Sequence, residues 1–190
     1  MAKRKKWITA AELMAQLHAD PEWVRRHEEN EARHAASVAK LRAEIEPEHA
    51  PLLRDLAGIG MRVSSVSDLV NMSAPYPKAI PVLLQHFATA RHPVMRNTLA
   101  RALTVQEAEG IAAGTILREL RRETDSEARW AMANALTIVA TPSDADEIAA
   151  LLADPAYADV HERLGRALKN LRRARRRRSG PKRRTADPSA

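Results

Sequence analysis

The fold is indicated most strongly by three stretches that share one pattern: PVMRNTLARAL at residues 93–103, SEARWAMANAL at residues 126–136 and ADVHERLGRAL at residues 158–168. In each stretch, apolar residues recur at the spacing of one helical face. The leucine or methionine that opens the apolar core of each pattern recurs after 33 and then 32 residues. Self-similarity at this period indicates stacked helix pairs, because a single pair cannot bury its own apolar face.

The segments between these stretches are predicted to supply a second helix for each unit. Shorter apolar runs occupy residues 79–87, 113–120 and 148–152. Turn residues fall at matching places between the helices, at His92-Pro93, at residues 124–127 and at Asp154-Pro155. The sequence therefore predicts about three helix–turn–helix units within residues 63–171.

The amino-acid composition supports an all-α fold. Only six of the 190 residues are aromatic and only six are glycine. Alanine and aliphatic side chains must therefore fill the core, and the glycine-rich turns of a β-sandwich are missing. The chain has no cysteine, which excludes disulfides, thiolate metal sites and a cysteine nucleophile. It also has neither a secretion signal nor an apolar run long enough to span a membrane, so we expect a cytoplasmic protein.

The N-terminal part of the chain is predicted to be helical and highly charged. Residues 1–8 are interpreted as a basic arm, and residues 9–62 as a charged helical segment. A long helix is expected to begin at Asp20-Pro21, because Asp caps helices and Pro is favoured in the first turn. This helix has only a thin apolar edge. Pro47 is predicted to end it, because proline lacks a backbone N–H and crowds the preceding turn.

The positive charge of the chain lies at its two ends. Fourteen of the 31 basic residues cluster there; without them and Asp187, the body has 17 basic and 23 acidic residues. The body is therefore mildly acidic, although the whole chain has a net charge of +7. We expect residues 172–190 to form a disordered basic tail. The clustered cations are Lys3, Arg4, Lys5, Lys6, Lys169, Arg172, Arg173, Arg175, Arg176, Arg177, Arg178, Lys182, Arg183 and Arg184.

These terminal cations are candidates for binding a polyanion, namely DNA or RNA. Arginine side chains contact phosphates in a forked geometry, and neutralising phosphates releases counterions. No aromatic side chains are interleaved with the cations, so base stacking and sequence-specific recognition are not expected. Two alternatives remain open: a solvated tail that extends the last helix, and binding to an acidic protein or an anionic membrane surface.

The repeated segments resemble HEAT repeats. In that family, a turn with Asp or Pro precedes a helix of the form Val-Arg-x-x-Ala-x-x-Ala-Leu, and a second helix is rich in Ile-Pro-x-Leu-Leu. Residues 93–103 and 125–136 match the first helix, and residues 80–84 match the second. The third unit departs from the pattern, because His161 stands where the other two units have arginine.

The resemblance covers about residues 64–171, and the lead-in from Asp68 to Val82 is similar to that of bacterial HEAT-repeat proteins without a known activity. It implies a short α-solenoid of about three helix pairs, whose second helices line a concave surface where partners dock. The leading hypothesis is a non-catalytic scaffold or adaptor that binds a protein partner there. The alternative is a nucleic-acid-associated protein that uses its basic arms.

The candidate contacts for a protein partner are the outward residues of the second helices, which grade from basic to acidic along the chain. Within the middle helix, Glu119 and Glu123 lie among three arginines, so i,i+4 ion pairing is the expected alternative for those arginines. The candidate contact residues are Lys78, Gln85, His86, Arg118, Arg121, Arg122, Asp146 and Glu147.

No catalytic, cofactor or metal site is expected. The third alternative is a DNA glycosylase of HEAT-like build, for which Asp125 and Trp130 share one repeat without a second groove aromatic. His27, Glu31 and His34 fall on one face of the long helix at metal-ligand spacing. No partner glutamates stand on apolar helices, so this face is interpreted as solvated.

Overall fold

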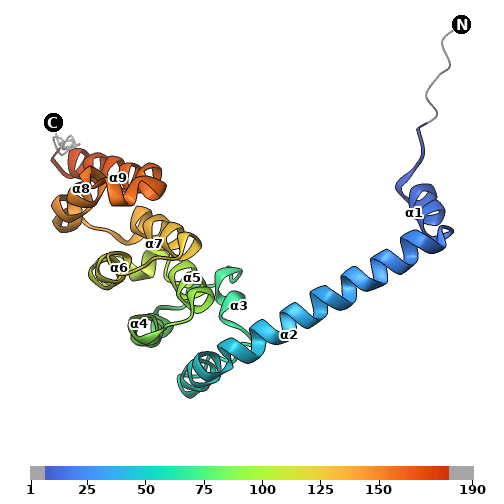
Figure 1. Ribbon diagram of the computed structural model, residues 1–190. Helices are drawn as coiled ribbons and strands as arrows, with labels where there is room; N and C mark the ends of the chain where they lie inside the picture. Colours follow the sequence, from blue (N-terminus) through green and yellow to red (C-terminus); the bar gives the residue numbers. More distant parts are fainter. Residues whose placement is uncertain (1–6, 180–190) are drawn as a thin grey trace, which may run out of the picture. The chain divides into compact units, whose positions relative to one another are not determined.

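The computed structural model describes residues 7–179, with side chains as far as Arg175. Over this range the ordered elements are all helices and no strand is present, which confirms the all-α class. The chain divides into two units, residues 1–46 and 47–190, and each is described here by itself. Helix α2 (Pro21–Gly58) contributes residues to both units (Figure 1).

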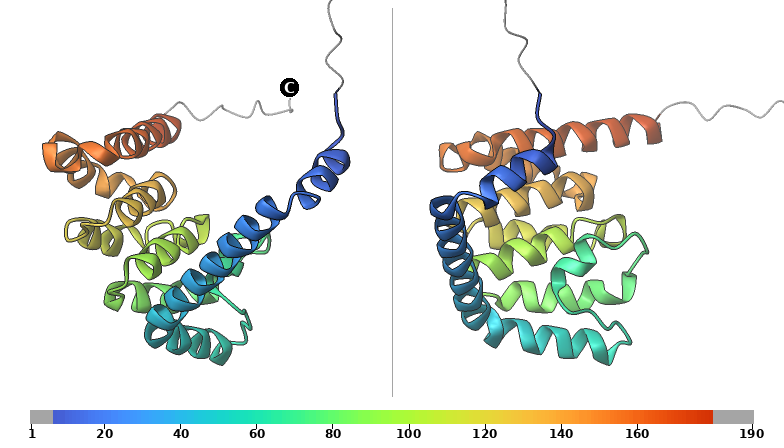
Figure 2. Two further views of the ribbon diagram at one scale, coloured as in Figure 1. Left: turned by 45° about the vertical axis from the view of Figure 1, so that its right-hand side comes forward. Right: turned by 90° about the vertical axis from the view of Figure 1, so that its right-hand side faces the viewer.

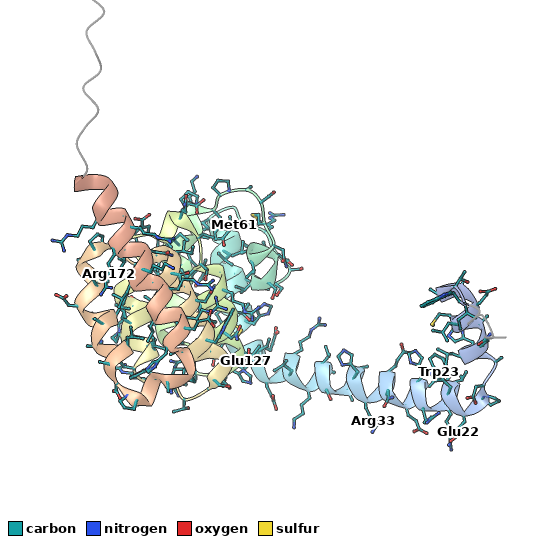
Figure 3. All side chains as sticks on the ribbon, turned by 90° about the horizontal axis from the view of Figure 1, so that it is seen from above. Glu22, Trp23, Arg33, Met61, Glu127 and Arg172 are labelled. Carbon is teal, nitrogen blue, oxygen red and sulfur yellow. The ribbon has the colours of Figure 1, made fainter. Side chains whose placement is uncertain are left out.

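The first unit contains helix α1 (Ala10–His18) and most of α2. Helix α1 begins with the capping box expected for its sequence. The Glu12 carboxylate accepts from the Thr9 N–H at 2.8 Å, and the Glu12 N–H donates to the Thr9 hydroxyl at 3.2 Å. None of residues 7–46 is buried. Figure 3 shows the part of α2 around Arg33 with no other helix of this unit beside it.

The prediction that Pro47 ends the long helix is wrong, because α2 continues through Pro47 and Pro51 to Gly58. A proline inside a helix costs about 3 kcal/mol or more. Leu52 and Leu56 are completely buried in the second unit, and burial of each leucine is worth about 1.5–3 kcal/mol. Tertiary packing therefore maintains the helix at a place where the local sequence favours an end.

Helix α2 ends beside two glycines, Gly58 and Gly60. Gly60 has a φ of 84°, in the left-handed region that favours glycine. Its N–H donates to the Ala57 carbonyl at 2.9 Å, and the Met61 N–H donates to the Leu56 carbonyl at 2.9 Å. These two bonds are the Schellman motif, which satisfies carbonyls at the helix end.

The described part of the second unit contains seven further α-helices joined by short turns. The helices are α3 (Val66–Val70), α4 (Ile80–Thr89), α5 (Pro93–Ala102), α6 (Ala113–Leu120), α7 (Ser126–Val139), α8 (Ala145–Ala153) and α9 (His161–Ser179). Four 3₁₀ turns accompany them: η1 (Pro77–Ala79), η2 (Gln106–Ala108), η3 (Pro142–Asp144) and η4 (Pro155–Val160).

These helices lie in two layers (Figures 1 and 2). Helices α5, α7 and α9 pack side by side in one layer, while α4, α6 and α8 form the other. The shorter apolar runs predicted as second helices correspond to α4, α6 and α8, with small shifts at their ends. The three patterned stretches correspond to α5, α7 and the start of α9.

The positions that repeat in the sequence form the core between the layers. Leu99, Met132 and Leu164 are each 0% exposed, and so are the equivalent alanines three residues later. Because alanine is small, helices that meet at it can approach closely. The residues that recur at this spacing in the sequence are therefore residues that are buried in the structure.

The prediction that a disordered tail begins at residue 172 is wrong for residues 172–179, because α9 runs as far as Ser179. Leu168 and Leu171 are each 8% exposed, so the apolar side of α9 is held in the core beyond its middle. Arginine and alanine favour helix, and cations near a helix C-terminus interact favourably with its dipole. The remainder of the predicted tail, residues 180–190, lies outside the described residues.

Candidate interaction surfaces

Helix α9 carries a concentrated positive charge along most of its length. Nine cations and no acid lie between Arg163 and Arg178. Lys169, Arg172 and Arg173, here called the basic helix surface, are all exposed. Because α9 is anchored through its apolar side, these cations are held on a rigid element. Among the other predicted polyanion-binding residues, Arg175 is exposed and Arg176, Arg177 and Arg178 follow in the same helix.

The remaining candidates for polyanion binding lie outside the described residues. Lys3, Arg4, Lys5 and Lys6 precede the described residues. Lys182, Arg183 and Arg184 follow them.

A groove of about 430 Å³ lies between α8 and α9, beside the basic helix surface. Leu152 and Leu168 supply its apolar lining, and the three cations of the basic helix surface also line it. The groove therefore combines aliphatic contact area with positive charge.

The residues predicted on the second helices form two ion pairs with neighbouring helices. The His86 imidazole lies 2.7 Å from the Asp55 carboxylate of α2. Arg121, just past the end of α6, pairs with Glu147 of α8. The basic and acidic ends of the predicted gradient thus partly neutralise each other within the protein.

The other predicted residues on this layer do not converge on a common site. Lys78, Gln85, Arg122 and Asp146 are exposed and spread over four elements or their ends. Arg118, half exposed, approaches the adjacent Glu119 at 3.3 Å. The layer of second helices therefore presents polar side chains that are spread over its surface and do not form one site.

A buried ionic cluster was missed by the sequence interpretation. Glu119 and Glu123 do not rely on i,i+4 pairs within α6; instead they meet Arg96 of α5. The Arg96 Nε lies 2.5 Å from Glu123, and one Arg96 terminal nitrogen lies 3.8 Å from the Glu119 carboxylate. All three side chains are at most 14% exposed. The other Glu123 oxygen accepts from the backbone N–H groups of Thr124 and Asp125 at 2.8 and 2.9 Å.

Arg129, the equivalent arginine of the next helix pair, also binds a turn that follows it in the chain. Arg129, which lies 33 residues after Arg96, donates to the Ala156 carbonyl at 2.6 Å and pairs with Asp159 at 2.9 Å. Its guanidinium also lies 4.9 Å from the ring centre of Tyr157, a cation–π distance. Arg96 and Arg129 thus each bind the turn that leads into the next helix pair. The signal in the sequence was the recurrence of arginine at the repeat period.

The two residues considered for a glycosylase site have local roles in the structure. The Asp125 carboxylate caps α7 by accepting from the Ala128 N–H at 2.9 Å. The Trp130 ring lies between Arg101 and Arg163, at 5.9 and 4.7 Å from its centre. These contacts use the aspartate as a cap and the indole as a packing surface.

The histidines of α2 show ordinary helix-surface geometry. His27 lies 3.4 Å from Glu31, and both side chains are about half exposed or more. Among the described residues, no three potential ligands of the His, Cys, Asp and Glu types come together as a metal site. Within the same range, no helix has the length and apolar character needed to cross a membrane.

One buried hydroxyl has a strongly shifted pKa. Burial, aided by the nearby negative charge of Glu107, raises the pKa of Tyr76 to about 12. Its hydroxyl donates to the Ala102 carbonyl at 2.8 Å, at the end of α5. This bond ties the segment before α4 to the core, so Tyr76 has a structural role. In comparisons with known proteins, no family model, curated protein or solved structure matches the chain.

Proposed function

We propose that residues 63–171 form a short α-solenoid of about three HEAT-like helix pairs, and that the protein is a non-catalytic adaptor that binds nucleic acid through α9. Two observations support the solenoid: the repeated core positions are buried together, and Arg96 and Arg129 bind equivalent turns. In such an array each unit contacts only its neighbours, which leaves the surfaces of the helices available for binding.

The observation that carries the binding proposal is the cation density of α9. Nine cations and no acid occupy the stretch from Arg163 to Arg178 of one helix, whose apolar side is anchored in the core. The free energy of binding to nucleic acid is then electrostatic, because neutralising phosphates releases condensed counterions. Cations held on a folded helix lose less conformational freedom on binding than cations on a flexible tail.

The expected mode of binding is sequence-independent. The exposed side chains of the basic helix surface are lysine and arginine, which contact phosphate oxygens. Two aromatic rings near this end of the chain, Trp130 and Tyr157, already contact arginines of the protein. The protein is therefore expected to bind duplex DNA and RNA with similar affinity and a strong dependence on salt.

The test replaces Lys169, Arg172 and Arg173 together with glutamine. A matched control replaces Arg62, Arg118 and Arg122, three exposed arginines elsewhere, and so removes the same charge. Binding of the full chain to a labelled duplex is measured by fluorescence anisotropy at several salt concentrations. Each phosphate contact contributes a slope of about 0.9, so three lost contacts should lower the slope by about 2.7.

The control triple variant should keep most of its salt dependence. Equal losses in both triple variants would mean that binding follows net charge and not α9. Unchanged binding in the α9 variant would overturn the proposal. Circular dichroism checks that both variants remain folded.

A protein partner on the layer of second helices is the second candidate. It is favoured by the exposure of Lys78, Arg122 and Asp146, which form no ion pair within the described part of the chain. A pull-down with and without nuclease distinguishes the two candidates, because a direct protein partner survives nuclease treatment. Loss of every captured protein after nuclease treatment would exclude this second candidate.

A further inference from the structure

Within the described part of the first unit, residues 7–46, the apolar edge of α2 is not fully buried. Residues 21–46 of this helix include no buried residue, and the Val38 side chain is 46% exposed. A groove lined by Ala35, Val38, Ala39, Arg42, Ala43 and Glu46 borders this edge at Val38. In proteins, most of the stability of a helix comes from packing of its apolar face. Along this edge Val38 is exposed and Val24, Leu41 and Ile45 are only partly buried, so the apolar residues make fewer contacts than residues of a core.

The exposed edge has the seven-residue spacing of a coiled-coil seam. Val24, Glu31, Val38 and Ile45 follow one another at intervals of seven residues. His27, His34 and Leu41 each come three residues after one of the first three. These are the a and d positions of a heptad pattern, which face a partner helix. Glutamate and histidine at such positions lower stability but specify register and orientation.

The seam is complementary to itself in only one direction. When two copies run antiparallel and are centred between residues 32 and 33, Val24 of one copy faces Leu41 of the other. His27 then faces Val38, and Glu31 faces His34. Val24 thus meets an apolar residue and Glu31 meets a hydrogen-bonding partner, whereas His27 meets an apolar residue. In a parallel pair, Glu31 would face Glu31, and like charges in contact oppose association.

The charge of the helix favours the same direction. Residues 22–31 contain four glutamates and two arginines, whereas residues 33–43 contain three cations and no acid. Glu44 and Glu46 follow the basic stretch and, in the antiparallel register, lie beyond Glu22 of the other copy. An antiparallel pair places the acidic half of one helix beside the basic half of the other at both ends. A parallel pair places like halves together. Because complementary charge governs the orientation of helix pairs, both halves of α2 select the antiparallel arrangement.

We infer that the protein forms a homodimer through antiparallel pairing of residues 21–46 of α2 with the same residues of a second copy. This inference goes beyond the proposed function, since it concerns a different unit and does not require nucleic acid. The Glu31 side chain contacts His27 of its own helix at 3.4 Å, and this pair is exposed on the seam. Pairing adds His34 of the other copy beside the same carboxylate.

The first experiment measures the oligomeric state of the full chain by analytical ultracentrifugation. The wild-type protein is expected to have the mass of two chains, and Val38→Asp is expected to have the mass of one. Val94→Asp is the matched control, because Val94 is also exposed, at 39%, but lies in the second unit. A wild-type monomer at all concentrations, or a dimer unaffected by Val38→Asp, would overturn the inference.

The second experiment determines the direction of pairing and uses the absence of cysteine from the chain. Mixed Val24→Cys and Leu41→Cys proteins are expected to form a disulfide-linked heterodimer under mild oxidation. Val24→Cys alone is expected to remain unlinked, because the two copies of residue 24 lie about 26 Å apart along the antiparallel pair. Disulfides require Cα atoms within about 7 Å.

A matched pair of cysteines serves as the control for this experiment. Arg26→Cys and Lys40→Cys lie at the same level as the seam pair but on the other side of the helix. Their mixture should not become linked. Linking of Val24→Cys to itself would show a parallel pair and contradict the inference, as would equal linking of the control mixture.

Discussion

The two units of this protein are both helical, yet they owe their helices to different causes. In the second unit, Leu99, Met132 and Leu164 are completely buried and recur at the period of the sequence. In the first unit, no residue between 7 and 46 is buried. Its helices depend on a capping box, on favourable helix formers and on charged side chains spaced three or four residues apart. Helical periodicity therefore predicts a helix in both units but a core in only one.

The largest difference in stability between matched substitutions in the two units is expected at the buried ionic cluster. Arg96→Met should lower the free energy of unfolding by about 3–5 kcal/mol, because Glu123 would remain buried without a counter-charge and Glu119 would keep only the half-exposed Arg118. The matched change Arg33→Met, in the first unit, should have an effect within about 0.5 kcal/mol. Chemical denaturation measures both values. Similar small effects would show that the cluster contributes nothing that an exposed arginine does not.

The repeated apolar core provides the next largest effect. Leu103→Ala and Leu136→Ala should each lower the free energy of unfolding by about 2–5 kcal/mol, as cavity-forming changes do. Both side chains are at most 1% exposed. Leu13→Ala, at a residue of α1 that is 44% exposed, should change it by less than about 0.5 kcal/mol. Costs below about 0.5 kcal/mol at Leu103 and Leu136 would contradict the repeat alignment.

A smaller effect is expected at Tyr76, and it depends on pH. Tyr76→Phe removes the hydrogen bond to Ala102 and should cost about 1 kcal/mol at neutral pH. The pKa of this tyrosine is raised to about 12, against about 10 when unfolded. The folded state thus binds the proton more tightly, and the stability due to this group is present below pH 10 and lost between about pH 10 and pH 12.

The pH dependence gives a direct comparison of two proteins. The difference in unfolding free energy between the wild type and Tyr76→Phe should shrink as the pH rises through this range. Urea unfolding at several alkaline pH values measures it. A difference that stays constant would contradict the shifted pKa.

The smallest effect on stability is expected on the layer of second helices. Changing Arg121 and Arg122 to Glu should alter the free energy of unfolding by less than about 1 kcal/mol, because the Arg121–Glu147 pair is exposed. Arg118 is left in place, because it lies beside the buried Glu119. If a protein partner binds there, the association rate should fall and its salt dependence should change. Matched reversals at Arg101 and Arg166 should have little effect on binding. A larger loss of binding from the Arg101 and Arg166 reversals than from those on the second helices would place the interface on the layer of α5, α7 and α9.

Sequence reasoning succeeded where one local pattern was repeated. The helices α5, α7 and α9 were predicted because each carries the same apolar spacing, and their equivalent residues are buried. It failed at Pro47, where burial of Leu52 and Leu56 outweighs the local preference for a helix end. It failed again at residue 172, because the burial of Leu171 extends a helix that the charge density suggested would be disordered.

The candidate contact residues were harder to predict than the fold. The pairing of Arg121 with Glu147 depends on how α6 and α8 lie in one layer, and no spacing within either helix reveals it. The role of Arg96 was recognisable in principle, since an arginine recurs 33 residues later at Arg129. A charge that recurs together with the core positions is a candidate for burial, whereas a charge that varies from unit to unit is a candidate for solvent.

The arginine that binds the following turn also bears on how this protein can change in length over evolution. Arg96 and Arg129 each connect their own unit to the start of the next one. Duplication of a helix pair would therefore also duplicate the arginine that joins it to the next pair. The last unit has His161 at this position, and its imidazole contacts the Asp154 carbonyl of the preceding turn at 3.4 Å. This contact joins His161 to the turn before its own helix, whereas Arg96 and Arg129 bind turns that follow them in the chain.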